Sequence, residues 1–229
     1  IGGSDGTLML AEKLTMNASS SVLDIGCGIG GPARFLSSEF GCKVSGIDLT
    51  ADFVNTGNSL TDQVGLSDKV KLIEASALSI PFADNSFDVS YMIHVGINIA
   101  DKDVLFSEAF RVTKPGGVFG IYDVMLLGNC ELQYPLPWAV EEDGNAIASA
   151  TDYISALIKA GFSLKHEDDK TDFANSFFEK MSARKDSSDG PPPVGLHLLM
   201  GDLTAQKIRN MAKLIKSGII APKILILEK

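Results

Sequence analysis

The stretch that decides the fold is Val22-Leu23-Asp24-Ile25-Gly26-Cys27-Gly28-Ile29-Gly30-Gly31, in which a short apolar run ends abruptly in glycines. The apolar half predicts a buried parallel strand, and Arg34-Phe35-Leu36 then continue a helical pattern. Gly26 and Gly28 allow a tight turn and a close approach of a ligand to the main chain. Glycines also often do no more than connect a strand to a helix, so the loop alone is compatible with either a ligand-binding turn or a simple connection.

A second apolar run, Lys43-Val44-Ser45-Gly46-Ile47-Asp48, ends in an acid about 20 residues after the glycines. In a βαβ unit the ends of the two strands lie side by side, so the Asp48 carboxylate can accept hydrogen bonds from both hydroxyls of an adenosine ribose. The alternative is a helix cap, because Asp48 or Thr50 can open the next helix. The two roles are compatible.

The loop chemistry separates the two cofactors that use this arrangement. The glycines continue through Gly30 and Gly31 to Pro32, and Asp24 stands two residues before the first of them. An acid at that place suits an ammonium group and is a poor neighbour for a pyrophosphate. S-adenosylmethionine carries such an ammonium and a sulfonium, so the pattern favours it over a dinucleotide.

Four segments carry a resemblance to a known family. Val22–Gly31 resembles the first motif of class I S-adenosylmethionine-dependent methyltransferases, and Gly46–Thr50 resembles their acidic motif on the second strand. Ala77–Val89 is similar to the stretch that links the third and fourth strands, and Arg111–Gly117 to the turn before the fifth. The motifs occur in the family's order. The rest of the chain is most similar to the small-molecule branch that includes sarcosine and dimethylglycine N-methyltransferase-like proteins.

The resemblance implies methyl transfer from S-adenosylmethionine, with S-adenosylhomocysteine as product, to a small molecule. An amine nitrogen is the expected acceptor, and oxygen and carbon stay open. In the family an acid after the third strand often binds the adenine amino group, whereas Ser76 stands there in this chain, so we assign adenine to Ser76 and the Ala77 amide. Ile1-Gly2-Gly3 matches the end of a segment that lies over the cofactor. The residues expected to bind the cofactor are Gly3, Asp24, Gly26, Cys27, Gly28, Asp48, Leu49, Ser76, Ala77 and His94.

The acceptor side rests on fewer signals. His94 follows the fourth predicted strand and is the single catalytic candidate, as a base for an ammonium or hydroxyl acceptor; the alternative is a histidine that only bonds the cofactor or the backbone. Trp138 can bind a cationic acceptor through its ring face, or simply seal the core. His197 faces either a pocket or the core. The residues expected to bind the acceptor are His94, Asn98, Trp138 and His197.

Composition limits the partners. A net charge of −9 and a pI near 4.8 argue against a nucleic-acid substrate, and the basic residues of 207–216 alternate with apolar ones as on the solvated face of an amphipathic helix. The cysteines Cys27, Cys42 and Cys130 have no metal-ligand spacing, so we expect neither a metal site nor a disulfide. Without an apolar run long enough to cross a bilayer, and without a leader, a cytosolic location is expected. The first residue is not a methionine, so upstream residues are an open question.

We expect one domain over 1–229, with a Rossmann-like, doubly wound α/β sheet of seven strands, mostly parallel with an antiparallel last strand. The predicted strands lie near 21–26, 43–47, 70–74, 87–93, 117–125, 162–167 and 223–228. The predicted helices lie near 31–40, 51–64, 101–112 and 150–160. Residues 168–222 are interpreted as an insertion that covers the substrate, with helices at 173–184 and 204–216 around a loop at 186–193.

Two other functions stay open from the sequence. A dinucleotide-dependent oxidoreductase uses the same βαβ geometry, and a catalytically silent binding protein would fit the lack of a certain base. Neither the acceptor nor the oligomeric state can be read from the residues.

Overall fold

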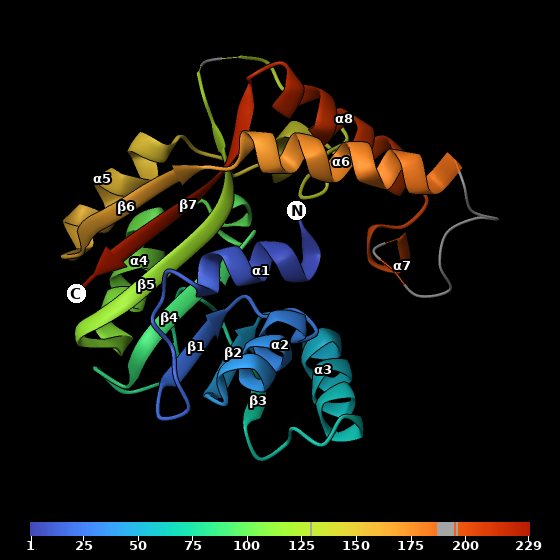
Figure 1. Cartoon of the computed structure of the whole chain (residues 1–229). Coiled ribbons are helices and arrows are strands. Elements are labelled where there is room, and N and C mark those ends of the chain that lie inside the picture. Colours follow the sequence, from blue (N-terminus) through green and yellow to red (C-terminus); the bar gives the residue numbers. More distant parts are fainter. Residues whose placement is uncertain (129, 187–194, 196) are drawn as a thin grey trace.

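The computed structural model describes residues 1–128, 130–186, 195 and 197–229. These residues form one seven-stranded sheet in the order β3-β2-β1-β4-β5-β7-β6 (Figure 1). Its strands are β1 (Ser21–Ile25), β2 (Lys43–Asp48), β3 (Val70–Glu74), β4 (Phe87–Ile93), β5 (Thr113–Leu126), β6 (Ser163–Asp169) and β7 (Ile220–Glu228). The first five are parallel, and β7 runs antiparallel between β5 and β6. The predicted fold class is confirmed.

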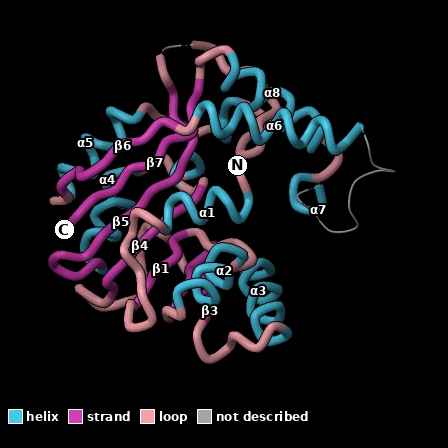
Figure 2. The backbone as a smooth tube through the Cα atoms, viewed as in Figure 1, coloured by secondary structure: helices cyan, strands magenta, loops and turns pink. Residues whose placement is uncertain are grey.

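Helices cover both faces of the sheet (Figure 2). Successive residues of a strand point to opposite faces, so Val22 packs in one core and Leu23 in the other. The Val22 face is covered by α1 (Gly3–Ala11), α2 (Gly31–Phe40) and α3 (Ala51–Gln63). The Leu23 face is covered by α4 (Lys102–Val112) and α5 (Ala150–Ala160). The four helices predicted here from periodicity agree with the structure to within one residue.

The fifth strand begins earlier than predicted. Thr113 pairs with Phe87 and the regular register starts only at Val118, so the segment expected to be a turn is an irregular start of β5. Gly116 supplies a φ of 73° there, and its amide donates to the Lys229 carbonyl at 2.8 Å. The turn-forming residues are therefore used to bend a strand rather than to end a helix, because α4 has already ended at Val112.

The insertion runs from 170 to 219, slightly shorter than predicted, and carries α6 (Thr171–Asp186), α7 (His197–Met200) and α8 (Thr204–Lys216). α6 and α8 lie together beyond the carboxyl ends of β4 and β5 (Figure 1). They close a third apolar cluster, whose buried members are Ile97, Val124, Leu136, Ala174, Met211, Leu214, Ile215 and Ile220. The predicted loop at 186–193 lies outside the described residues except for Asp186, which ends α6.

Two short 3₁₀ turns complete the chain, η1 (Gly96–Asn98) after β4 and η2 (Glu142–Gly144) after β5. Within the described ranges, the helices are all too short or too polar to cross a bilayer.

Gly57 in α3 packs closely against the glycine loop. A Cβ added there would lie 2.4 Å from Leu72 Cδ1 and 2.9 Å from the Ile29 carbonyl oxygen. Alanine in place of glycine favours a helix by about 1 kcal/mol, but overlap with a packed backbone costs about 1–3 kcal/mol. We therefore expect Gly57→Ala to lower the melting temperature in thermal unfolding.

Ser59→Ala, on the exposed side of the same helix, is the control and should leave the melting temperature nearly unchanged. A Gly57→Ala protein more stable than the wild type would show that helix propensity dominates at this position.

Candidate active site

The glycine loop is held at the carboxyl end of β1 by its neighbour β2. The amides of Gly26 and Cys27 both donate to the Ile47 carbonyl, at 2.8 and 2.9 Å. Gly26 has a φ of 74°, and a Cβ on it would lie 2.4 Å from Val95. Gly28 has a φ of 54° and no atom within 4 Å of the place where its Cβ would be. The loop is thus packed against protein at Gly26 and faces open space at Gly28.

Asp48 ties this loop to the next helix. One carboxylate oxygen accepts the Gly28 amide at 2.8 Å and the other accepts the Thr50 amide at 2.9 Å, where α3 begins. Each oxygen of a carboxylate has two lone pairs, so each keeps one site for a further donor. The ligand role and the helix-entry role proposed for Asp48 are therefore compatible. Leu49, the next residue, is 74% exposed although it is a large apolar side chain.

Asp24 lies under the loop and is 2% exposed. Its neighbours in the sheet are Gly46 on β2 and Tyr91 on β4. Burial raises the pKa of Asp24 to about 7, Tyr91 opposes this rise, and the charge of Asp48 adds to it. Asp24 Oδ2 and the Tyr91 hydroxyl are both buried without a hydrogen bond of good geometry. An acid in this state has unused capacity for a cationic group.

The segment after β3 joins the same edge of the sheet. The Ala75 amide donates to the Asp48 carbonyl at 2.9 Å, which places Ser76 and Ala77 directly beside the Asp48 strand end. The Ser76 hydroxyl oxygen accepts the Leu78 amide at 3.1 Å and retains its proton for another partner. Ser76 and Ala77 are both half-buried. The structure therefore brings the predicted adenine residues next to the predicted ribose residue.

His94 directly follows β4 with a φ of 58°, and its amide donates to the Tyr122 carbonyl at 2.8 Å. Its ring lies 4.7 Å from the Tyr122 ring between centroids. Nε2 lies 2.6 Å from the backbone nitrogen of Ile1, and Nδ1 lies 3.9 Å from Asp123 Oδ1, which is too long for a hydrogen bond. Burial lowers the pKa of His94 to about 4, with Asp123 opposing the effect. The imidazole is neutral at pH 7, and its titration lies below the neutral range expected from the sequence.

The start of α1 reaches the site together with Ile1. Gly3, the predicted cofactor residue, is the exposed first residue of α1. Gly2 packs on the insertion, because a Cβ on it would lie 2.6 Å from the Phe173 ring of α6. The segment 1–3 is thus bounded by β4 on one side and by α6 on the other.

Asp123 is the residue that sequence reasoning missed. It is fully buried in β5, and its Oδ2 accepts the Ile97 amide at 3.1 Å and the Tyr153 hydroxyl at 3.0 Å. A Cβ on Gly96 would lie 2.8 Å from the same oxygen. Asp123 therefore fixes η1 and the backbone just after His94. The available signal was a single acid inside the apolar run 118–126.

The predicted acceptor residues are only partly assembled. Asn98 is exposed, and its side-chain amide donates back to the His94 carbonyl at 3.4 Å. The indole N–H of Trp138 donates to Asn145 at 2.9 Å while the ring packs on the third apolar cluster, which also holds Ile97. His197 begins α7, and the position of its side chain lies outside the described part of the structure.

The polar atoms left without partners fit a cofactor with an amino-acid end and a nucleoside end. Asp24 Oδ2, the Tyr91 and Tyr122 hydroxyls and His94 Nδ1 are buried and unpaired on three adjacent strands. Asp24 matches an ammonium, Asp48 a pair of ribose hydroxyls, and the exposed Leu49 an adenine face. Open space at Gly28 allows the ligand to reach the main chain between them.

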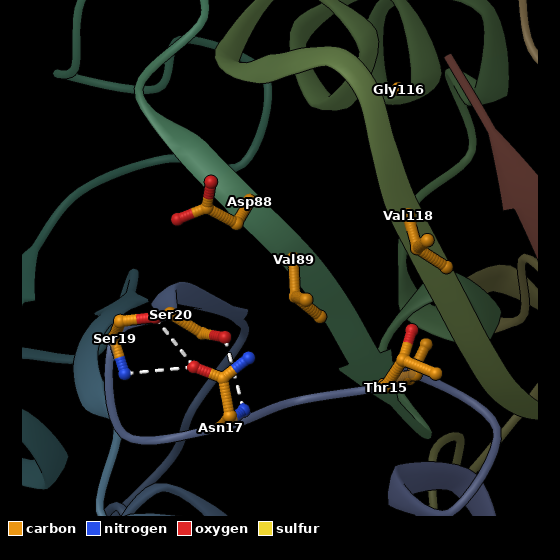
Figure 3. A pocket seen from close by; sticks show the side chains of 9 residues that line it. Thr15, Asn17, Ser19, Ser20, Asp88, Val89, Gly116 and Val118 are labelled. Carbon is orange, nitrogen blue, oxygen red and sulfur yellow. Dashed lines mark hydrogen bonds between the residues drawn. The ribbon is translucent and has the colours of Figure 1, made fainter.

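A hollow of about 270 Å³ lies at the opposite edge of the sheet, where the parallel strands begin (Figure 3). Asn17, Asp88 and Gly116 are among its lining residues. Asp88 is already satisfied, because it accepts the Ser21 amide and pairs with Lys114 at 2.7 Å. This hollow is separate from the glycine loop. Among the described residues, no group of three or more His, Cys, Asp or Glu side chains is arranged to hold a metal ion.

Comparison with known proteins agrees with this geometry. Residues 23–121 match the family model described as a methyltransferase domain. That range contains the glycine loop, Asp48, Ser76 and His94. The fold and site define a class I methyltransferase domain, and the chain belongs to the S-adenosylmethionine-dependent methyltransferases.

Relatives come from several branches of small-molecule chemistry. A sterol 24-C-methyltransferase of Gibberella zeae is 35% identical over 166 residues, which are 70% of this chain and 44% of that protein. The chain thus spans about half the length of the curated relatives that it matches.

Among solved structures, geranyl diphosphate C-methyltransferase from Streptomyces coelicolor superposes with a TM-score of 0.80 at 19% identity, over 98% of this chain and 77% of that one. A candidate sarcosine dimethylglycine methyltransferase from Galdieria sulphuraria gives a TM-score of 0.78 at 21% identity, over 97% and 84%. At such identities the likeness concerns the fold alone.

The Asp24 carboxyl makes stability depend on pH. Its pKa is raised from 3.8 to about 7 in the folded protein, so the folded state holds this proton more tightly than the unfolded chain. Stability is lost as the pH rises from about 4 to 7, because the unfolded chain releases the Asp24 proton in this range while the folded protein still holds it. Above about pH 7 the folded protein instead holds a buried charge. Asp24→Asn removes this pH-dependent contribution to the free energy of unfolding. We expect it to stabilise the protein at pH 8 by roughly 2–4 kcal/mol, and not at pH 4.

Chemical unfolding at both pH values measures the effect. Asp5→Asn, at an exposed acid of α1, is the control and should follow the wild type. A penalty for Asp24→Asn that is equal at pH 4 and pH 8 would mean that the folded protein does not hold the acid as described.

Proposed function

We propose that this protein transfers a methyl group from S-adenosylmethionine to a small-molecule acceptor. The observation that carries the proposal is the pairing of Asp48 with the Gly28 amide at the open side of the glycine loop. It places a carboxylate with free acceptor sites beside main chain that a ligand can reach. The family match supports the same activity.

The residues divide the cofactor between them. We assign the ribose to Asp48, the ammonium to Asp24, and adenine to Leu49, Ser76 and the Ala77 amide. Cys27 and the glycines at 26 and 28 shape the main chain of the loop, and Gly3 belongs to the segment beside His94. When bound, S-adenosylmethionine supplies an electrophilic methyl group on a sulfonium.

The chain's own contribution to transfer is placement of the reacting groups. In-line displacement needs the acceptor atom aligned with the methyl carbon, and alignment alone supplies roughly 7–11 kcal/mol in well-oriented reactions. His94 is neutral, and because the Ile1 nitrogen donates to Nε2, the ring proton is on Nδ1, the nitrogen that faces Asp123. The nitrogen that can accept a proton from the acceptor is therefore Nε2, in place of its contact with Ile1. Asp123, 3.9 Å away, is placed to stabilise the imidazolium that would result.

The acceptor is proposed to lie beyond His94, against the third apolar cluster. An amine nitrogen is the acceptor expected from the sequence. The structure is compatible with it, because the Trp138 ring belongs to that cluster and its N–H is occupied by Asn145, which leaves the ring face for a cation. A carbon acceptor on an apolar molecule is the second candidate. The aliphatic residues of the cluster favour it, as does similarity to a protein named as a sterol 24-C-methyltransferase. A cytosolic location and the absence of a nucleic-acid partner stay predictions.

Asp48→Ala tests the cofactor assignment. Two hydrogen bonds to a carboxylate contribute roughly 1.5–3 kcal/mol each, so the variant should bind S-adenosylhomocysteine at least about tenfold more weakly in calorimetry. Asp52→Ala, at an exposed acid in the first turn of the same helix, should bind like the wild type. Unchanged affinity in a folded Asp48→Ala protein, or tighter binding of NAD by the wild type, would contradict the assignment.

His94→Gln tests the chemistry, with whichever acceptor a panel of amines, phenols and sterol-like alcohols selects. If His94 is the base, kcat falls by about 10²-fold or more while cofactor affinity stays within a few fold. Because the pKa of His94 is about 4 in the free protein, the wild-type rate should fall only below neutral pH, and the variant should lose that limb. His166→Gln, at an exposed edge-strand histidine, is the control. A persistent acid limb in His94→Gln assigns the residue to positioning instead.

A further inference from the structure

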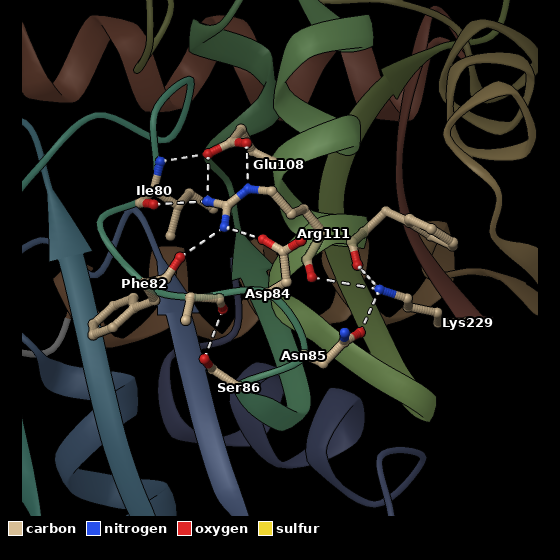
Figure 4. Close-up of polar contacts among 10 residues, drawn as sticks. Ile80, Phe82, Asp84, Asn85, Ser86, Glu108, Arg111 and Lys229 are labelled. Carbon is tan, nitrogen blue, oxygen red and sulfur yellow. Dashed lines mark hydrogen bonds and ion pairs between the residues drawn. The ribbon is translucent and has the colours of Figure 1, made fainter.

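Arg111 and Glu108 form a clasp on the segment that follows β3 (Figure 4). The Arg111 guanidinium donates to the carbonyls of Ile80 and Phe82, at 2.8 and 2.7 Å. Glu108 accepts the Ile80 amide at 2.7 Å. Both backbone groups of Ile80 are therefore held by one ion pair that projects from the end of α4.

The clasp uses the full capacity of an arginine. Besides the two carbonyls, Arg111 donates twice to Glu108, at 2.7 and 2.8 Å, and once to Asp84 at 2.9 Å. These contacts account for all five N–H donors of the guanidinium, and a lysine with three donors at one point could not reproduce them. The bond from Arg111 lowers the pKa of Glu108, which keeps this acid charged.

The clasp is mounted on a rigid support. Leu105, Phe106, Ala109 and Val112 of α4 are 0% exposed and pack in the core on the Leu23 face. Glu108 and Arg111 extend from the same helix to the loop, whose Ile80 and Phe82 side chains pack in that core. A side-chain pair anchored in this way transmits the position of the helix to the loop backbone.

The segment between β3 and the clasp is short and fixed at both ends. At one end the Ala75 amide bonds the Asp48 carbonyl, and at the other Ile80 is held by the clasp and is 4% exposed. Between them lie 76–79, a single turn closed by the bond from the Ser79 amide to the Ser76 carbonyl. We therefore expect a displacement of Ile80 to shift Ser76 and Ala77 relative to Asp48.

We propose that Arg111 and Glu108 are positioning residues that hold the 76–79 turn in the geometry that recognises the adenine edge of the cofactor. The proposal rests on the proposed function, because it takes Ser76 and Ala77 as adenine ligands. It adds that recognition of the base is set from α4, by two side chains that touch no cofactor atom.

The test compares two ligands that differ only at the adenine edge. Affinities for S-adenosylhomocysteine, and for its analogue with oxygen in place of the adenine amino group, are measured by calorimetry on the wild type, Arg111→Gln and Glu108→Gln. Arg111→Gln should bind S-adenosylhomocysteine about tenfold more weakly, the equivalent of one or two lost hydrogen bonds, and the analogue less than about threefold more weakly. The wild-type preference for adenine should therefore shrink. Glu108→Gln, which keeps the side-chain shape, should change it in the same direction and carries the test if Arg111→Gln fails to fold.

Lys114→Gln is the matched control. Its partner Asp88 also holds a backbone amide, that of Ser21, but at the opposite edge of the sheet. This variant should leave both affinities unchanged. Equal losses for the two ligands in the clasp variants, or no loss, would overturn the positioning role while leaving the proposed function intact. A wild-type protein that binds neither ligand would overturn the proposed function and the clasp proposal together.

Discussion

The bond between the Asp48 carboxylate and the Gly28 amide is the constraint on which the site depends. It joins the loop after β1 to the end of β2, and the other carboxylate oxygen fixes the start of α3. The Asp48 carbonyl then holds Ala75, so three consecutive strand ends share one residue. Because parallel strands present their carboxyl ends at one edge, this residue organises the part of the edge formed by β1, β2 and β3.

The electrostatics of the site follow from burial without partners. Asp24 and His94 are both desolvated, and burial moves their pKa values in opposite directions, the acid to about 7 and the imidazole to about 4. Each group therefore tends toward its neutral form in the free protein. A cationic ligand would lower the pKa of Asp24 again, since it would place beside the carboxylate the positive charge that the surrounding protein lacks. Binding of such a ligand is accordingly coupled to release of a proton near neutral pH.

Local patterns predicted the elements well. The helices at 31–40 and 150–160 were predicted correctly because apolar periodicity and caps are local, and the place of Asp48 was predicted correctly because a strand end is visible in the sequence. What failed depends on contacts between distant residues. Arg111 was recognised only as part of a turn, because its partners Ile80 and Phe82 lie 31 and 29 positions away. Asp123 was missed for the same reason, since its role depends on hydrogen bonds from η1 and from Tyr153, which are distant in the sequence.

The third apolar cluster has a consequence for how such a protein diversifies. Its buried residues come from β5 and the connection that follows it, from the start of β7, from η1 and from the insertion, and it is distinct from the two cores that flank the sheet. Met211, Leu214 and Ala174 thus belong to a cluster that includes neither the glycine loop nor Asp48. Selection can alter this cluster, against which we propose that the acceptor lies, while the donor side of the reaction is inherited intact, so one scaffold can move between acceptors by successive small changes.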